Sequence, residues 1–320
     1  MTTITETHAT PPSVDARGWR PEATTCRAVV DERLVATAER IGSTLPPRVR
    51  DALAELTERA PQAGALLLRG LPVGELPPTP ATPRRPVAKD RISELVLLAV
   101  ARRLGQPVGY EPEHGGDIVQ NIVPTRRAAG RQTSTSSRVE LMFHTEAAFH
   151  PHRPRYLLLL CLRGDPSAAT TLASIHEVLP QLPAAVVEVL FEPRFRTAVD
   201  ESYLHGRRNV LGAPMAVLTG DRGRPAMVLD ADLMVGTDAT ADDALRVLGG
   251  AVAAHHTAVV LEPGDLLIVD NGAAVHGRSP FTPRFDGTDR WLQRTFVVAD
   301  LRASEGERRG RVITTRFGAA

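Results

Sequence analysis

Two histidines and one glutamate in this chain have the residue types and the spacing of an iron(II) site. His144 and Glu146 are two positions apart, and His276 lies much later, after the apolar run 266–269. If residues 141–149 form a strand, its side chains alternate between two faces, so His144 and Glu146 project from the same face. With His276 as a third ligand, two imidazoles and one carboxylate hold iron(II) and leave positions free for a co-substrate and O₂.

The segment that leads to His276 strengthens this interpretation. His-x-Glu alone is weak evidence, because a histidine and an acid two positions apart occur by chance in many proteins. Here a Pro-Gly-Asp turn at 263–265 starts an apolar strand, an Asp-Asn pair at 270–271 ends it, and His276 follows. A loop at this point could present the imidazole to a cavity.

Composition indicates an ordinary globular protein of 320 residues, in which 38 basic residues nearly balance 37 acidic ones. This balance gives no support for a nucleic-acid or anionic-membrane partner. The two cysteines, Cys26 and Cys161, make neither a disulfide framework nor a zinc-ribbon pattern. No apolar run is long enough to span a bilayer, and the polar start lacks the hydrophobic region of a signal peptide, so we expect a cytoplasmic protein.

The elements that must position the three residues can be placed from periodicity. Residues 1–25 are polar and rich in Pro and Thr, so we expect them to be disordered or frayed, and we interpret residues 26–320 as a single domain. Apolar spacing predicts helices at 30–41, 49–60, 92–104, 175–190 (interrupted by prolines) and 241–256, a strand at 65–70 and a loop at 76–86.

From Gly109 onward, short apolar runs separated by turn signals predict a β-sandwich or barrel. The expected strands are 118–123, 139–145, 156–162, 170–174, 195–199, 216–218, 226–229, 258–261, 266–269 and 291–298. The predicted fold class is therefore mostly β, with a double-sheet core and helices packed outside it.

Taken together, the motifs resemble in order and spacing those of iron(II)- and 2-oxoglutarate-dependent oxygenases of the clavaminate synthase type, a branch related to taurine dioxygenase. The resemblance runs from about Gly64 to Val298. It implies a double-stranded β-helix, or jelly-roll, fold of the cupin-like kind. It also implies that His144, Glu146 and His276 are the iron ligands. Many relatives carry Asp where this chain has Glu146, and Glu is typical of the clavaminate synthase branch.

The resemblance also implies a site for the remote carboxylate of 2-oxoglutarate. Arg290, fourteen residues after His276, matches the family's arginine for this task. A planar guanidinium suits a carboxylate because it donates two parallel hydrogen bonds. Thr170 matches the threonine that assists it, and Thr171 is the alternative. The structural alternative for Arg290 is a surface ion pair with a neighbouring aspartate, Asp286 or Asp289.

Substrate residues follow from the same resemblance. Arg294 matches an arginine that binds the substrate carboxylate in amino-acid hydroxylases of this branch, and Asp230, with Asp232, matches the acid for a cationic end. Gln120 and Ser134 fall where polar contacts to substrate occur, beside Glu146. An amino acid needs both kinds of partner, because each of its charges is costly to bury unpaired. The alternative for the two aspartates is a solvated turn before a helix.

Other charged residues are expected to lie outside the catalytic site. Residues 126–131, with Arg126, Arg127 and Arg131, are expected to form a mobile loop, and a lid over the substrate is the sharper alternative. The histidines outside the ligand set are expected to be surface or supporting residues: His150, His152, His255 and His256.

The expected function is hydroxylation of a free amino acid with a basic or polar side chain, arginine being the first choice, at C3 or C4, in secondary metabolism such as antibiotic biosynthesis. The implied cofactors are Fe(II), 2-oxoglutarate and O₂, with succinate and CO₂ as co-products. Within the oxygenases, the alternatives are oxidation of a β-lactam precursor and desaturation or cyclisation of an amino-acid derivative. From other classes, a zinc-dependent hydrolase and a non-catalytic jelly-roll binding protein stay open.

Overall fold

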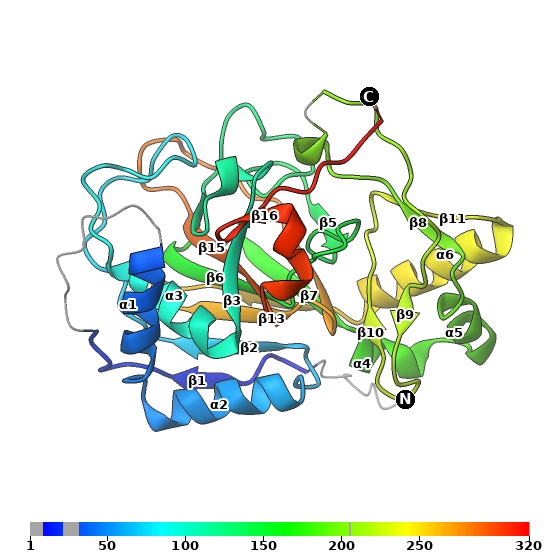
Figure 1. Cartoon of the computed structure of the whole chain (residues 1–320), viewed down its shortest axis with the longest axis horizontal. Helices are drawn as coiled ribbons and strands as arrows, with labels where there is room; N and C mark the ends of the chain where they lie inside the picture. The colour runs from blue at the N-terminus through cyan, green and yellow to red at the C-terminus, as the bar shows by residue number, and fades with distance from the viewer. Residues whose placement is uncertain (1–8, 22–31, 205, 320) are drawn as a thin grey trace, which may run out of the picture.

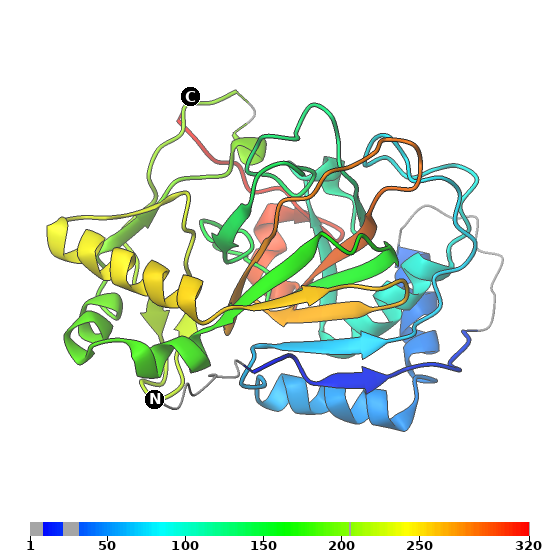
Figure 2. The ribbon, with the colours of Figure 1, turned by 180° about the vertical axis from the view of Figure 1, so that it is seen from behind.

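Two β-sheets face each other and are enclosed by helices on both outer sides. The computed structural model describes residues 9–21, 32–204 and 206–319. Helices α1 (Glu32–Gly42), α2 (Pro47–Glu58) and α3 (Ile92–Leu104) gather at one end of the molecule, and α5 (Ala184–Leu190) and α6 (Ala239–Ala254) at the other (Figures 1 and 2).

The helices at the first end follow the predicted apolar spacing. α3 has the predicted bounds, and α2 starts at Pro47, whose fixed φ and missing N–H suit a first helical position. The prediction for 30–41 is confirmed from Glu32 onward, and its first two residues lie outside the described residues. Apolar side chains of all three helices pack on the outer face of the larger sheet.

The larger sheet has the strand order β1-β2-β13-β6-β15-β3-β17-β16, with β4 also paired to β15. Its strands are β1 (Ser13–Asp15), β2 (Ala65–Arg69), β3 (Gln106–Tyr110), β4 (Gln120–Ile122), β6 (Tyr156–Arg163), β13 (Leu266–Asp270), β15 (Trp291–Val298), β16 (Arg308–Arg309) and β17 (Val312–Ile313). Along β15, Trp291 and Val297 pack toward the helices, whereas Leu292 and Phe296 pack toward the other sheet. Alternation therefore directs Arg294, and Arg290 just before the strand, to the inner face.

The smaller sheet has the order β12-β7-β14-β5, formed by β5 (Leu141–His144), β7 (Ala169–Ser174), β12 (Thr257–Val260) and β14 (Ala274–Arg278). Leu172 and Ala274 pack against the larger sheet, whereas Ala173 and Val275 pack against the outer helices. By the same alternation, Thr170 and His276 face inward. The space between the two sheets can therefore receive polar residues from both.

The outer layer beside the smaller sheet contains α4 (Ile175–Val178), α5, α6 and the short strands β8 (Phe195–Thr197), β9 (Leu218–Thr219), β10 (Ala226–Met227) and β11 (Met234–Gly236). Short 3-10 turns complete the chain at His114–Gly116, Leu179–Gln181, Glu201–Tyr203 and Arg302–Glu307. The helix predicted at 175–190 is thus two short helices, because Pro180 and Pro183 interrupt it. Ser174 caps the first of them through its hydroxyl, which accepts from the N–H of His176.

Several expectations from the sequence are wrong. β5 ends at His144 instead of continuing to residue 149, and β14 forms where a loop was expected around His276. β3 was not predicted. Within the segment expected to be disordered or frayed, residues 13–15 form β1, which pairs with β2 in parallel. Residues 1–8 and 22–25 lie outside the described residues, as does Cys26.

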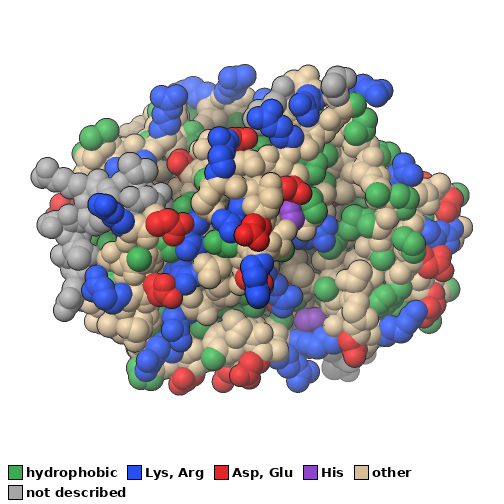
Figure 3. Space-filling view, viewed as in Figure 1, with side chains coloured by type: hydrophobic (Ala, Val, Ile, Leu, Met, Phe, Trp, Pro, Cys, Tyr) green, Lys and Arg blue, Asp and Glu red, His purple; other side chains and the backbone are tan. Residues whose placement is uncertain are grey.

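Basic and acidic side chains are both spread over the face shown in Figure 3, in keeping with the near-zero net charge. Among the described residues, no helix combines the length and the apolar character that crossing a bilayer requires.

Candidate active site

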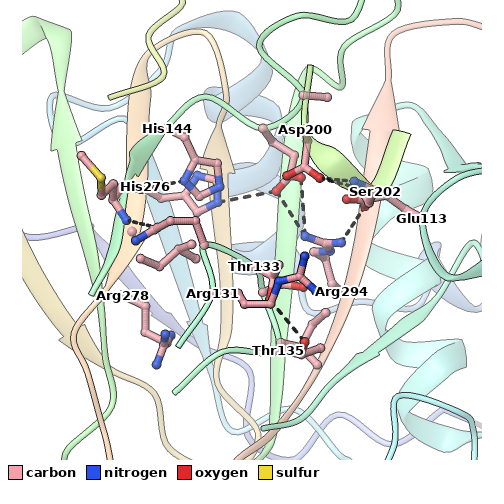
Figure 4. A pocket seen from close by; sticks show the side chains of 18 of the residues that line it. Glu113, Arg131, Thr133, Thr135, His144, Asp200, Ser202, His276, Arg278 and Arg294 are labelled. Atoms are coloured by element: carbon pink, nitrogen blue, oxygen red, sulfur yellow. Dashed lines mark hydrogen bonds and ion pairs between the residues drawn. The ribbon is translucent and has the colours of Figure 1, made fainter. Parts of the chain in front are cut away.

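His144, Glu146 and His276 converge between the two sheets, near the edge of the smaller one. His276 in β14 lies directly opposite His144, the last residue of β5. The two imidazole rings are 4.3 Å apart between centroids, and Nε2 of His276 is 3.6 Å from Oε2 of Glu146. One ligand atom from each residue lies within 4.8 Å of the others. Figure 4 shows the two histidines side by side at the pocket wall.

Glu146 reaches this cluster from a turn, not from the strand that was expected. The chain leaves β5 after His144, and Ala147 has φ of 51°, in the left-handed region that only a few per cent of non-glycine residues occupy. The N–H of Thr145 donates to the carbonyl of Leu229, which anchors the start of the turn. The convergence of the carboxylate with His144 is thus produced by a sharp change in chain direction.

The protonation states in the cluster suit a divalent metal. Burial lowers the pKa of His276 to about 4, with His144 as a further cause, so its imidazole is neutral at pH 7. Burial acts to raise the pKa of Glu146, but Arg294 and the imidazoles more than offset it and bring the pKa down to about 2. Neutral imidazole and ionised carboxylate are the forms that bind metals. This donor set fits iron(II) with positions left open.

Arg290 is a buried guanidinium whose only described hydrogen bond is a long one, from Nη2 to Oγ1 of Thr170 at 3.5 Å. No carboxylate of the described residues forms an ion pair with it. The alternative of a surface pair with Asp289 is wrong, since that carboxylate accepts from the backbone N–H groups of Arg284 and Phe285. A buried unpaired cation is costly, so the site calls for an anion from outside the chain.

Of the two candidate threonines, Thr170 lines the cavity beside Arg290. Thr171 points from the opposite face of β7, and its buried hydroxyl has no partner among the described residues. The geometry therefore favours Thr170 as the neighbour of an anion held by Arg290.

Arg294 is buried among acceptors at the other side of the pocket. It donates to Oε1 of Gln120 from Nε at 2.9 Å and from Nη2 at 2.6 Å, and its Nη1 is 3.4 Å from Oε2 of Glu146. Its Nη2 also pairs with Glu113 at 2.7 Å. Figure 4 shows the guanidinium of Arg294 beside Glu113, with a dashed line for their ion pair. Gln120 keeps a buried amide nitrogen with no partner among the described residues.

Glu113 was missed from the sequence. It lies between β3 and the 3-10 turn that follows. No sequence motif distinguishes it from an ordinary surface glutamate. Burial raises its pKa to about 7, even though Arg294 lies beside it. At neutral pH the pocket therefore contains a carboxyl group that is close to half-protonated.

Asp230 also lines the pocket, next to His144. It forms an isolated β-bridge with His144, and its Oδ1 accepts from the N–H groups of Asp232 at 3.0 Å and Leu233 at 2.9 Å. Burial raises its pKa. Asp232 is exposed but also lines the cavity, as does Ser134. Both aspartates thus border the pocket that the iron site faces, although they do occupy a turn.

One cavity of about 440 Å³ is lined by His144, Glu146, His276, Arg290, Thr170, Arg294, Glu113, Asp230, Asp232 and Ser134. Gln120, predicted to contact the substrate, is not among the residues that line this cavity. Its wall includes residues that the sequence analysis did not single out for the site: Glu113, His114, Asp200, Tyr203 and Arg278. Arg127 and Arg131 also line it, and Arg131 forms an ion pair with Glu201. The segment around Arg131 is therefore part of the pocket wall and is tied to a distant segment, which favours the lid interpretation over an unattached loop.

Comparison with known proteins gives a consistent assignment. The model of the taurine catabolism dioxygenase TauD, TfdA family matches residues 31–296. L-lysine 3-hydroxylase of Catenulispora acidiphila is 41% identical over 289 residues, which are 88% of this chain and 81% of the relative. L-asparagine oxygenase of Streptomyces coelicolor is 41% identical over 283 residues, covering 87% and 84%. Clavaminate synthase 2 of Streptomyces clavuligerus is 34% identical over 289 residues, covering 87% of each chain.

Solved structures agree. Asparagine oxygenase in complex with Fe(II), 3-hydroxyasparagine and succinate superimposes with a TM-score of 0.83 at 40% identity, covering 91% of each chain. The non-heme iron oxygenase OrfP in complex with Fe, succinate and (3S)-hydroxy-L-Arg gives a TM-score of 0.83 at 33% identity, covering 94% of this chain and 99% of the other. The alternatives of a zinc-dependent hydrolase and a non-catalytic binding protein are wrong, and iron(II), 2-oxoglutarate and O₂ are confirmed as cofactors. The chain belongs to the TauD/TfdA dioxygenase family, in the amino-acid hydroxylase branch of the iron(II)- and 2-oxoglutarate-dependent oxygenases.

Proposed function

We propose that this enzyme hydroxylates a free amino acid with a cationic side chain, L-arginine being the first choice, at C3 or C4. The observation that carries the proposal is a single pocket whose lining combines a buried arginine, Arg294, with two carboxylates, Asp230 and Asp232. A guanidinium amino acid presents a carboxylate and a cation that match this arrangement.

In this proposal, His144, Glu146 and His276 hold the iron, and Arg290 with Thr170 holds the remote carboxylate of 2-oxoglutarate. When bound, iron(II) couples the decarboxylation of 2-oxoglutarate by O₂ to oxidation of a substrate C–H bond. The chain's part is to orient the two substrates and to exclude water. We also propose that the two facing sheets form a jelly roll, and that residues 26–320 are one oxygenase domain.

Arg294 must change partners when the amino acid binds. In the free enzyme its donors are occupied by Gln120, Glu113 and Glu146. With Glu146 engaged as a metal ligand, Nη1 of Arg294 would be free to donate to the substrate carboxylate. Gln120, which is not part of the cavity lining, would hold the guanidinium through Nε, and Ser134, which lines the cavity, would offer its hydroxyl to the substrate.

Two aspartates at one side favour a guanidinium over a neutral amide. Its five N–H donors are arranged in a planar fork that can serve two carboxylates at once. The relatives cover several amino acids, since their names include lysine and asparagine and OrfP was solved with hydroxyarginine. Asp232, being exposed, could adjust to side chains of different length.

A substrate panel tests the proposal. The purified enzyme with Fe(II) and 2-oxoglutarate is incubated with L-arginine, L-lysine, L-ornithine, L-citrulline and L-asparagine, and both succinate and product mass are measured. Arginine should give the highest kcat/KM and a product heavier by one oxygen. A loss of two hydrogens would assign desaturation or cyclisation instead. Absence of product from all five would reject a free amino acid of this class as substrate.

A further inference from the structure

The side-chain amide of Asn271 holds the backbone of Glu146 by two hydrogen bonds, one that it accepts and one that it donates. Oδ1 of Asn271 accepts from the N–H of Glu146 at 2.8 Å, and Nδ2 donates to the carbonyl of the same residue at 3.1 Å. Nδ2 also donates to the carbonyl of Pro154 at 2.9 Å. All of these groups are buried, and Asn271 is only 1% exposed.

This amide does the work that a neighbouring strand would otherwise do. Glu146 lies two residues after His144, the last residue of β5. Its N–H and carbonyl therefore have no partner in a neighbouring strand within the described part of the chain. A buried backbone group without a hydrogen-bond partner is destabilising. The amide of Asn271 satisfies both groups and so makes the turn, including the left-handed Ala147, a stable conformation.

Asn271 also links the two parts of the chain that supply the metal ligands. It belongs to the tight turn between β13 and β14, where Asp270 accepts from the N–H of Gly272 at 3.0 Å. β14 carries His276 five residues later. The turn is fixed in place on the other side by the ion pair between Asp270 and Arg155, at 2.6 Å. The position of Glu146 is therefore tied to the strand that holds His276.

We propose that Asn271 is a positioning residue for the iron, which aims the Glu146 carboxylate at the metal by clamping the backbone of that residue. The inference rests on the proposed function, in which Glu146 is an iron ligand. Groups that orient metal ligands without touching the metal typically contribute about 10- to 100-fold to metal affinity. Asn271→Leu, which keeps the branching at Cγ and removes the hydrogen-bonding groups, should weaken metal binding by that factor.

The experiment is an anaerobic titration of the full-length, metal-free protein with Co(II), followed by visible absorption, which reports both affinity and coordination geometry. The variants are Asn271→Leu and Asn271→Asp; the second keeps the acceptor for the Glu146 N–H and loses both donated bonds. Circular dichroism establishes which variants are folded. Both should bind Co(II) at least tenfold more weakly and with an altered spectrum.

Asn209 provides a matched control. Its side chain clamps another residue in the same two-way manner, accepting from the N–H of Val199 at 3.1 Å and donating to the carbonyl of Val199 at 2.8 Å, but Val199 is not a metal ligand. Asn209→Leu should leave Co(II) affinity within twofold of the parent. If it weakens binding as much as Asn271→Leu, the effect is a general one on the fold and the inference is wrong.

The remaining outcomes are also decisive. Folded Asn271 variants that bind Co(II) as tightly as the parent, with the same spectrum, overturn the positioning role, and so does the failure of both variants to fold. Glu146→Ala separates this from the proposed function: if the parent binds no Co(II), or if Glu146→Ala binds it unchanged, the assignment of Glu146 as a ligand fails first.

Discussion

His276 is the direct cross-strand partner of His144, so two of the proposed metal ligands are placed by the backbone pairing of β14 with β5. Only the third ligand, Glu146, depends on a turn. Two imidazoles fixed by a sheet and one carboxylate fixed by a turn make the carboxylate the adjustable member of the set. Catalysis should therefore be most sensitive to the length of the Glu146 side chain.

Shortening this arm tests that sensitivity. Glu146→Asp removes one methylene from a side chain whose backbone is held in place. Misplacing a reacting group by about 1 Å can cost on the order of 100-fold in rate, so kcat/KM should fall by about that factor. Steady-state kinetics with the preferred amino acid measures it. A loss of less than threefold would mean that the backbone shifts to compensate.

The guanidinium of Arg290 should be irreplaceable by an ammonium. Arg290→Lys keeps the charge but loses the forked pair of donors, and a hydrogen bond to a charged group contributes about 1.5 to 3 kcal/mol. We expect the KM for 2-oxoglutarate to rise at least tenfold and the KM for the amino acid to change less than twofold. Arg222→Lys, on an exposed arginine paired with Glu188, is the control and should change neither value.

Asp230 should determine the preference for cationic substrates. In Asp230→Asn the pocket keeps its shape but loses the half-buried carboxylate, so kcat/KM for arginine should fall on the order of 100-fold, the loss of one charge-assisted bond. The value for asparagine should fall less than tenfold, because a neutral amide does not need the charge. Asp243→Asn, on the exposed side of α6, serves as the matched change. Equal losses for both substrates would contradict the assignment.

Glu113 should make stability depend on pH. Its folded pKa of about 7 lies above the usual value of 4.5, so the folded protein binds more protons than the unfolded chain between these two pH values. The free energy of unfolding should therefore fall as the pH rises from about 4.5 to 7, by about 3 kcal/mol at most. Glu113→Gln, which can still accept from Arg294, should lack this fall. Urea unfolding of both metal-free proteins at several pH values measures the difference, and parallel curves would refute it.

The ion pair of Arg131 with Glu201 should matter for the covering of the pocket and not for folding. Both side chains are partly exposed, at 45% and 78%, and such pairs contribute about 1 kcal/mol or less to stability. Arg131→Gln should leave the urea midpoint unchanged and raise the KM for the amino acid by up to about fivefold, as an energy of this size allows. The double variant Arg131→Glu, Glu201→Arg should restore the KM; if it does not, the pairing is incidental.

The sequence predicted the residues of the candidate site more accurately than the strands and turns that position them. Short apolar runs between turn signals predicted β6, β13 and β15, and the resemblance to the family's motifs pointed to Arg290 and Arg294. β14 escaped detection because its inner face is polar where it borders the cavity, so His276 and Arg278 interrupt the apolar run. β3 was hidden by Pro107 and Gly109, which are unusual inside strands.

Other features could not be read from local patterns at all. The residues around Ala147 do not predict its left-handed conformation, because contacts with distant segments impose that conformation. Glu113 looks like an ordinary surface acid until β3 and β15 bring it against Arg294. Both are products of tertiary packing, which a reading of neighbouring residues does not capture.

The division of labour between the two sheets has a practical consequence. The smaller sheet carries both histidines of the proposed metal site, whereas Arg294, proposed to bind the amino acid, and Arg290, proposed to bind 2-oxoglutarate, lie in or directly before β15 of the larger sheet. Leu172 of the smaller sheet and Leu292 of the larger one belong to one buried apolar layer between the two sheets. Thinning or thickening that layer would slide a docked molecule past the reactive centre, so regioselectivity could be retuned by spacer residues that never touch it.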